Sequence, residues 1–250
     1  MYHFPPANPA AVRAIMTAVA RNRCGPGAPA VGRIASSPMT KPSYWDEATR
    51  LLAGRDPVLR GLIAAHPGLH LTRRGDPFTT LARAIVGQQI SVKAAQTIWE
   101  RLGKACGNGA AGAPLDPARV QRKRIATLRA CGLSERKAEY IRDLAKHFVA
   151  ARLDPSAWPA LDDEALIAAL VDVKGIGRWT AEMFLMFHEL RADVLPVDDI
   201  GLQKAVAAHY FDGERPTLAE LRALGEMWQP YRSVATWYLW RSLDPIPVEY

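Results

Sequence analysis

A chain of 250 residues, 49% of them apolar, can bury a full core, and this composition favours a globular fold over disorder. No apolar run approaches the roughly 18 residues that a transmembrane helix needs, so no membrane partner is expected. The formal net charge of +7 suits a polyanionic partner. The three cysteines, Cys24, Cys106 and Cys131, show no metal-ligand spacing and indicate free thiols in a reducing cytosol.

The basic surplus is concentrated at the start of the chain. Residues 1–38 carry four arginines and no acidic residue, and they are rich in Pro, Gly and Ala. Three interpretations stay open: a transit peptide, a disordered basic arm, or translation that begins at Met39. We therefore expect residues 1–40 to form a disordered or mis-annotated extension, and residues 41–250 to form the folded domain.

From Met39 onward the pattern is helical almost throughout. Segments that open on Ser or Asp and place apolar residues at helical spacing predict helices over 43–54, 56–68, 76–91, 91–107, 116–132, 134–153 and 162–173. Residues 106–117 are a linker rich in Gly and Ala. The best strand candidate is the short segment 70–74, so the predicted class is all-α.

The residues Lys174-Gly175-Ile176-Gly177 predict a tight turn between helix 162–173 and a second helix over 178–187. Glycine permits positive φ and close approach of another backbone. The second helix would offer its N-terminal N–H groups and positive dipole end to an anion. Such a hairpin can grip a nucleic-acid backbone without reading bases. An ordinary αα-hairpin with capping glycines explains the same residues equally well.

Two adjacent acids, Asp198 and Asp199, follow Pro196 and lead into a further helix. One acid at such a position is expected to cap the helix, which leaves the other for a different task. A carboxylate close to a bound nucleic-acid strand would be repelled by the phosphates. If Asp198 or Asp199 lies close to the bound strand, a catalytic role is the favoured explanation for a carboxylate at that place.

At these residues the chain resembles a known superfamily. "VKGIGRWTAEMFLMF" followed by "VLPVDDIGLQKA" is similar to the helix-hairpin-helix and Gly/Pro-Asp signature of DNA glycosylases, and within them to the 3-methyladenine DNA glycosylase II family. "FTTLARAIVGQQISVKAA" resembles the helix pair that carries the minor-groove wedge, and "WQPYRSVATWYLWR" resembles the closing helix. The resemblance covers residues 44–243. It implies the compact form: two helical lobes with the active-site cleft between them and no β-rich N-terminal domain.

The resemblance assigns roles residue by residue. It implies that Asp199 is the catalytic aspartate, that Trp179 and Trp240 line the base pocket, and that Gln89 is the DNA wedge. The residues implied in DNA-backbone binding are Gly175, Gly177 and Thr180. Core packing stays open as the alternative for both tryptophans. Arg232 matches a family arginine to which no role is assigned, and a catalytic contribution from Asp198 stays open.

The implied activity is that of a monofunctional 3-methyladenine DNA glycosylase II, which flips an alkylated purine out of double-stranded DNA and hydrolyses its N-glycosidic bond. Bifunctional relatives carry a Schiff-base lysine at the position of Trp179, so a lyase step is not expected. No cysteine follows Cys131, so no iron–sulfur cluster is expected. We expect no cofactor and no catalytic metal, with Na+ or K+ at the hairpin as a structural ion.

The resemblance further implies a bacterial, cytoplasmic, nucleoid-associated monomer. Two alternatives stay open: a non-catalytic helix-hairpin-helix DNA-binding module, and a structural helical protein whose charge only aids solubility. The residues do not rank 3-methyladenine, 7-methylguanine, 1-methyladenine, ethenoadenine or hypoxanthine as substrates.

Overall fold

The computed structural model describes residues 41–73, 75–106 and 114–243, and the expectations for residues 1–38 lie outside these ranges. Every regular element within the described ranges is helical, which confirms the all-α prediction. The strand candidate was wrong: residues 70–73 are irregular, because no second strand in the described part of the chain offers them a hydrogen-bonded partner. Within the same ranges, no helix has the length and apolarity to cross a bilayer.

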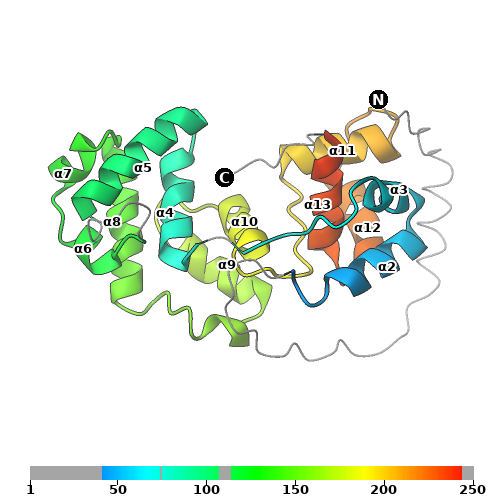
Figure 1. The fold of residues 1–250 in the computed structure, drawn as a ribbon, viewed down its shortest axis with the longest axis horizontal. Helices are drawn as coiled ribbons and strands as arrows, with labels where there is room; N and C mark the ends of the chain where they lie inside the picture. Colours follow the sequence, from blue (N-terminus) through cyan, green and yellow to red (C-terminus); the bar gives the residue numbers. More distant parts are fainter. Residues whose placement is uncertain (1–40, 74, 107–113, 244–250) are drawn as a thin grey trace. The chain divides into compact units, whose positions relative to one another are not determined.

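The chain divides into two compact units, and the first combines residues 41–72 with residues 190–243. Its elements are α2 (Trp45–Arg55), α3 (Pro57–Ala65), α11 (Ile200–Tyr210), α12 (Leu218–Gly225), the short 3-10 helix η2 (Glu226–Trp228) and α13 (Arg232–Leu243) (Figure 1). Helices α2, α3 and α11 all contact α13. The C-terminal helix is therefore the centre of this unit, and it brings together segments from both ends of the chain.

A buried aspartate ties the first unit together. Asp56 is 1% exposed and caps α3, where its Oδ1 accepts from the backbone N–H groups of Val58 (2.9 Å) and Leu59 (3.1 Å). Its Oδ2 accepts from the hydroxyl of Tyr210 (2.7 Å) and the indole N–H of Trp228 (3.1 Å). Burial, and then the Asp56 charge, raises the pKa of Tyr210 well above its ordinary value. Asp56 thus joins α3, α11 and η2.

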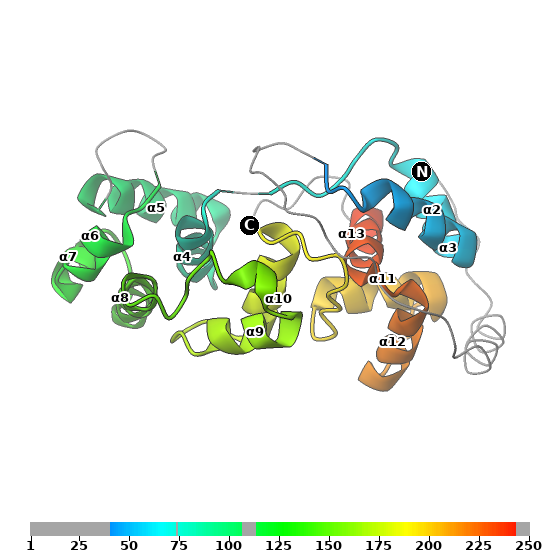
Figure 2. The ribbon, with the colours of Figure 1, turned by 90° about the horizontal axis from the view of Figure 1, so that it is seen from below.

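The second unit comprises residues 73–189. Its elements are α4 (Pro77–Gly87), α5 (Val92–Cys106), α6 (Pro117–Gln121), α7 (Ile125–Ala130), α8 (Glu135–Val149), the 3-10 helix η1 (Trp158–Ala160), α9 (Asp163–Val171) and α10 (Arg178–Phe187) (Figure 2). Helix α8 packs against α4, α6 and α7, while α10 packs against α9 and α4. The predicted helix-hairpin-helix is therefore present as α9, a turn and α10.

Two short helices, α6 and α7, replace the single helix predicted over 116–132. Val120 and Leu128 are buried on either side of the break and anchor the two pieces. Between them stand Arg122, Lys123 and Arg124, which supply no apolar side chain to hold a helical turn against the core. Arg124 has an extended backbone conformation and is the N-cap of α7.

Candidate active site

The hairpin between α9 and α10 requires glycine at its first glycine position. Gly175 has φ +85°, and a Cβ at this position would lie 2.2 Å from Cδ2 of Tyr140 on α8. A side chain would therefore meet both backbone strain and a collision with an aromatic ring. This glycine is explained by the fold alone.

The second glycine differs from the first. Gly177 is the N-cap of α10 with an ordinary φ of −91°, and nothing lies within 4 Å of a Cβ built there. The fold therefore has room for a side chain at Gly177. The N-terminal N–H groups and the positive dipole end of α10 lie at this position, which is a favourable arrangement for an anion.

The first turn of α10 carries two more of the predicted site residues. Trp179 is 38% exposed, so the alternative that it packs in the core was wrong. Thr180 follows it in the same turn. Both residues lie on the helix end that Gly177 caps.

An arginine that the sequence analysis missed joins the two hairpin helices. Arg178 donates from Nε to Glu182 (2.9 Å), and its two terminal nitrogens donate to the two carboxylate oxygens of Glu164 on α9. Hydrogen bonding to Glu164 raises the pKa of Arg178, and the same contact lowers the pKa of Glu164. The i,i+4 spacing of Arg178 and Glu182 could have indicated half of this network.

The predicted wedge residue lies on a turn that is connected to the hairpin. Gln89 is exposed and has φ +57°, and it directly follows Gln88, the C-cap of α4. The side-chain amide of Gln88 donates to the carbonyl oxygen of Gly175 (2.9 Å). The structure thus brings the turn at Gln89 and the hairpin together inside the second unit.

In the first unit, Asp199 and Trp240 lie together. Asp199 is 8% exposed and is the N-cap of α11; its Oδ1 accepts from the backbone N–H of Leu202 (2.6 Å). The same oxygen accepts from the indole N–H of Trp240 on α13 (2.8 Å). Two donors from different elements therefore fix the position of this carboxylate.

The structure corrects the roles that we predicted for Asp198 and Asp199. We expected one acid to cap the helix and the other to be available for chemistry. Helix α11 begins at Ile200, so Asp199, the residue next to it, is the cap, and Asp198 is exposed outside the helix. The cap and the predicted catalytic carboxylate are thus the same residue.

Gly201 makes room for the pair that Asp199 and Trp240 form. A Cβ at this position would lie 3.0 Å from Oδ1 of Asp199 and 3.2 Å from Cδ1 and Nε1 of Trp240. Its φ is not in the left-handed region, so this crowding is the reason why glycine fits best. This role of Gly201 was not predicted from the sequence.

The segment that leads to Asp199 is held by the start of α13. Arg232 donates from Nε and Nη2 to the two oxygens of Asp193 (2.8 and 2.9 Å), in a bidentate pair. Ser233 accepts from the backbone N–H of Val194 at its hydroxyl (2.9 Å) and donates its backbone N–H to Ala192 (3.0 Å). Arg232, which had no role assigned, therefore positions the chain that delivers Asp199.

A second support comes from α11 itself. The side-chain amide of Gln203 donates to the carbonyl oxygen of Val197 (2.8 Å), and its oxygen accepts from Arg215 (2.6 Å). Gln203 is buried. The turn before Asp199 is thus held by hydrogen bonds from α11 as well as by those from the start of α13.

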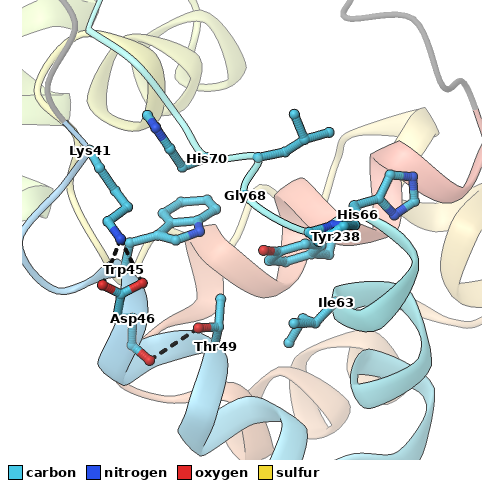
Figure 3. A pocket seen from close by; sticks show the side chains of 11 residues that line it. Lys41, Trp45, Asp46, Thr49, Ile63, His66, Gly68, His70 and Tyr238 are labelled. Atoms are coloured by element: carbon cyan, nitrogen blue, oxygen red, sulfur yellow. Dashed lines mark hydrogen bonds and ion pairs between the residues drawn. The ribbon is translucent and has the colours of Figure 1, made fainter.

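The first unit also contains a cavity of about 310 Å³ between α2, α3, residues 66–70 and α13 (Figure 3). Trp45 and Tyr238 line it, and an ion pair between Lys41 and Asp46 (2.6 Å) lies beside them. None of the predicted site residues lines this cavity.

The comparison with protein families agrees with this geometry. The model of the HhH-GPD superfamily of base excision DNA repair proteins matches residues 82–230, a range that contains the hairpin and Asp199. The chain belongs to this superfamily.

Similar proteins indicate which branch of this superfamily the chain resembles. DNA-3-methyladenine glycosylase 1 of Schizosaccharomyces pombe is 34% identical over 169 residues, which are 67% of this chain and 72% of that protein. The crystal structure of DNA-3-methyladenine glycosidase from Bacillus halodurans is similar with a TM-score of 0.73 and 36% identity, over 79% of this chain and 89% of that one. The predicted resemblance to the 3-methyladenine DNA glycosylases is confirmed.

A third similar structure is that of Schizosaccharomyces pombe 3-methyladenine DNA glycosylase (Mag1) in complex with abasic DNA. Its TM-score is 0.68 at 29% identity, over 82% of this chain and 98% of that chain. Among curated relatives the match covers between 38% and 96% of the relative's own length. The chain thus spans about two thirds of some of these proteins.

Proposed function

We propose that this protein is a monofunctional DNA glycosylase that flips alkylated purines of the 3-methyladenine type out of double-stranded DNA and hydrolyses their N-glycosidic bonds. The product is an intact abasic site. The observation that carries the proposal is the buried carboxylate of Asp199, fixed at Oδ1 by the N–H groups of Leu202 and Trp240. The family and the names of the relatives favour a glycosylase over a non-catalytic binding module.

The proposed role of Asp199 is electrostatic. As the glycosidic bond breaks, the sugar takes on oxocarbenium-like positive charge, and a fixed carboxylate stabilises that charge without reorganising. The same carboxylate can orient or deprotonate the attacking water. The two donors hold the group in place, and the Arg232–Asp193 pair holds the segment that carries it.

Base recognition in this proposal depends on aromatic faces. A glycosidic bond in stacked duplex DNA is out of reach, so the nucleotide is flipped at a cost of a few kcal/mol. The exposed indole of Trp179 would stack on the flipped base, and an alkylated, cationic ring gains about 0.5–2 kcal/mol from such a face. Trp240 would orient Asp199 and offer a second aromatic face to the base. Gln89, on its exposed turn, would fill the gap left in the stack.

The DNA backbone would be held by the hairpin. Gly177 leaves open space at the N-terminus of α10, where a phosphate can approach the N–H groups, and Thr180 adds a hydroxyl in the same turn. Hairpin carbonyl groups could hold Na+ or K+ as a structural ion that bridges to phosphate. Catalysis in this proposal uses no metal and no cofactor, and the protein acts as a monomer on alkylated DNA.

A base-release assay on methylated duplex DNA tests the function. The expected result is chromatographically resolved 3-methyladenine, with strands that stay intact until hot alkali cleaves the abasic sites. Borohydride should trap no adduct, because Trp179 has no amine to form a Schiff base. DNA binding without base release would favour the non-catalytic module. Nicked strands with a trapped adduct would point to an amine such as Lys174 or Lys204.

The backbone clamp is tested by Gly177→Asn. Asparagine is a good N-cap residue, and the free protein has room for it, so the melting temperature should stay near that of the wild type. The side chain would fill the space that the proposal gives to a phosphate. Binding should therefore weaken similarly for all DNA sequences, and its salt dependence should flatten. A changed base preference with unaltered binding to undamaged DNA would contradict the clamp.

A further inference from the structure

One face of α8 contacts both turns to which the proposed function assigns DNA contacts. Lys137, Tyr140, Asp143 and His147 follow one another at intervals of three, three and four residues, so their side chains lie along the same side of the helix. Lys137 reaches the turn at the end of α4, and the other three reach the hairpin. All of these residues belong to the second unit.

Lys137 contacts the end of α4 directly. Its ammonium donates to the carbonyl oxygens of Val86 (2.8 Å) and Gln88 (2.6 Å). The last carbonyl groups of a helix have no partner within the helix and carry the negative end of its dipole, so a cation is favourable there. Burial lowers the pKa of Lys137, which agrees with its partly enclosed position.

The residue next to this contact has an unusual backbone. Gln89 has φ +57°, a conformation that side chains other than glycine rarely adopt. It persists where the surroundings determine it. Gln88, the residue before it, is fixed on two sides: Lys137 binds its carbonyl, and its side-chain amide binds the carbonyl oxygen of Gly175.

The hairpin is supported by the rest of the same face. The ring of Tyr140 lies where a Cβ of Gly175 would be, and a carboxylate oxygen of Asp143 accepts from the backbone N–H of Lys174 (3.0 Å). Nε2 of His147 hydrogen-bonds with Oδ2 of Asp172 (3.1 Å). The two turns therefore share one rigid support.

We propose that Lys137 is a positioning residue for base flipping: it fixes the turn at Gln88, and thereby presents Gln89 to the gap that the flipped nucleotide leaves. This inference rests on the proposed function. Lys137 makes no contact with the reacting atoms in this scheme. Its loss should slow the steps that need an inserted wedge and should spare general binding to duplex DNA.

The test compares three variants of the full chain. Lys137→Met keeps the length of the side chain and removes its donors. Lys146→Met removes the same charge from an exposed position of the same helix and is the matched control. Gln89→Ala removes the wedge side chain. Flipping is followed by 2-aminopurine fluorescence next to a lesion, chemistry by single-turnover base release, and general binding by anisotropy on undamaged duplex.

Lys137→Met should slow flipping and base release by about 10- to 100-fold, the scale expected when a reacting arrangement is misplaced by about 1 Å. Its binding to undamaged DNA should match that of Lys146→Met. In the Gln89→Ala background, Lys137→Met should add little, because both changes remove the same wedge. A merely structural role would instead give effects that multiply in the double variant.

Two results would overturn the inference: flipping in Lys137→Met that equals flipping in Lys146→Met, or independent effects of Lys137→Met and Gln89→Ala. If Lys137→Met does not fold, Lys137→Gln replaces it in the same comparison, because it removes the ammonium group and shortens the side chain but keeps a polar end. The fluorescence readout separates this inference from the proposed function. A wild-type protein that flips but releases no base would contradict the glycosylase chemistry alone.

Discussion

Asp56 and Asp199 are two buried aspartates of the same unit with the same local chemistry. Each is the N-cap of a helix, and each accepts hydrogen bonds from a backbone N–H and from a tryptophan indole. Their surroundings differ. Asp56 is 1% exposed and binds four donors with its two oxygens, whereas the bonds from Leu202 and Trp240 both reach Oδ1 of Asp199, which is 8% exposed.

The neighbouring residues of Asp56 and Asp199 also differ. Asp56 lies under Tyr210 and Trp228, which close it off inside the core. Asp199 is flanked by the exposed Asp198 and by Ile200, which is 63% exposed, so it lies at the edge of its unit. Burial and capping therefore do not identify a catalytic carboxylate. Asp199 differs from Asp56 in its position at the edge of the unit and in the space that Gly201 leaves for its indole partner, and the proposed catalytic role is based on these features.

The largest effect on stability is expected at Asp56. Asp56→Ala leaves four donors, three of them buried, without their acceptor, which should cost about 3–5 kcal/mol of unfolding free energy. Activity per folded molecule should stay unchanged. Asp162→Ala removes an exposed N-cap of α9 and is the control, with an expected cost of about 1 kcal/mol. Denaturant unfolding of both variants measures these costs. Equal losses of unfolding free energy would show that Asp56 is an ordinary N-cap.

Trp240→Phe tests the surroundings of Asp199, the second of the two aspartates. It removes the indole N–H that donates to Oδ1 of Asp199 and keeps most of the aromatic surface. We expect the base-release step at saturating enzyme to slow by about tenfold, because the carboxylate loses part of its fixed orientation. Trp179→Phe is the matched change and should act on substrate capture instead. If the two variants behave alike, Trp240 does not act through Asp199.

A smaller effect is expected at Gly201. Ala at this position would push against Asp199 and Trp240, so base release should slow a few-fold, within the tenfold scale of a modest misplacement. Gly103→Ala in α5 is the control, since nothing lies within 4 Å of its Cβ, and it should stabilise the protein by about 0.5–1 kcal/mol. Rates and melting curves for both variants check this. An unchanged rate in Gly201→Ala would show that the pair tolerates the extra methyl group.

Much of the fold could be predicted because it depends on local patterns. Asp56-Pro57 and Asp76-Pro77 start α3 and α4 as N-cap and first-turn residues, and the apolar spacing that follows identifies the buried faces. The break between α6 and α7 was not predictable in this way. In one continuous helix, Val120 and Leu128 would lie on a similar face, so their spacing gives no sign of a break. The break depends on how the two short helices pack against α8.

The candidate site shows the same limit. Family resemblance pointed to Asp199, but its partner Trp240 is 41 residues away, and Asp193 is 39 residues from Arg232. Gln88 and Gly175 are 87 residues apart. Helical periodicity contains no information on such pairs, because they form only when distant elements pack. The same reason explains why the space at Gly201 emerged from the structure, because the distant Trp240 borders it.

The central claim is that Asp199, and not Asp198, carries the chemistry. Single-turnover base release from methylated DNA, measured for Asp199→Asn and Asp198→Asn with melting curves alongside, tests it most directly. Asn keeps the N-cap at position 199, so both proteins should fold with changes of about 1 kcal/mol or less. Asp199→Asn should lose two or more powers of ten in rate, on the order found for other preorganised electrostatic groups, while Asp198→Asn stays near wild type. An inactive, well-folded Asp198 variant beside an active Asp199 variant would contradict the account.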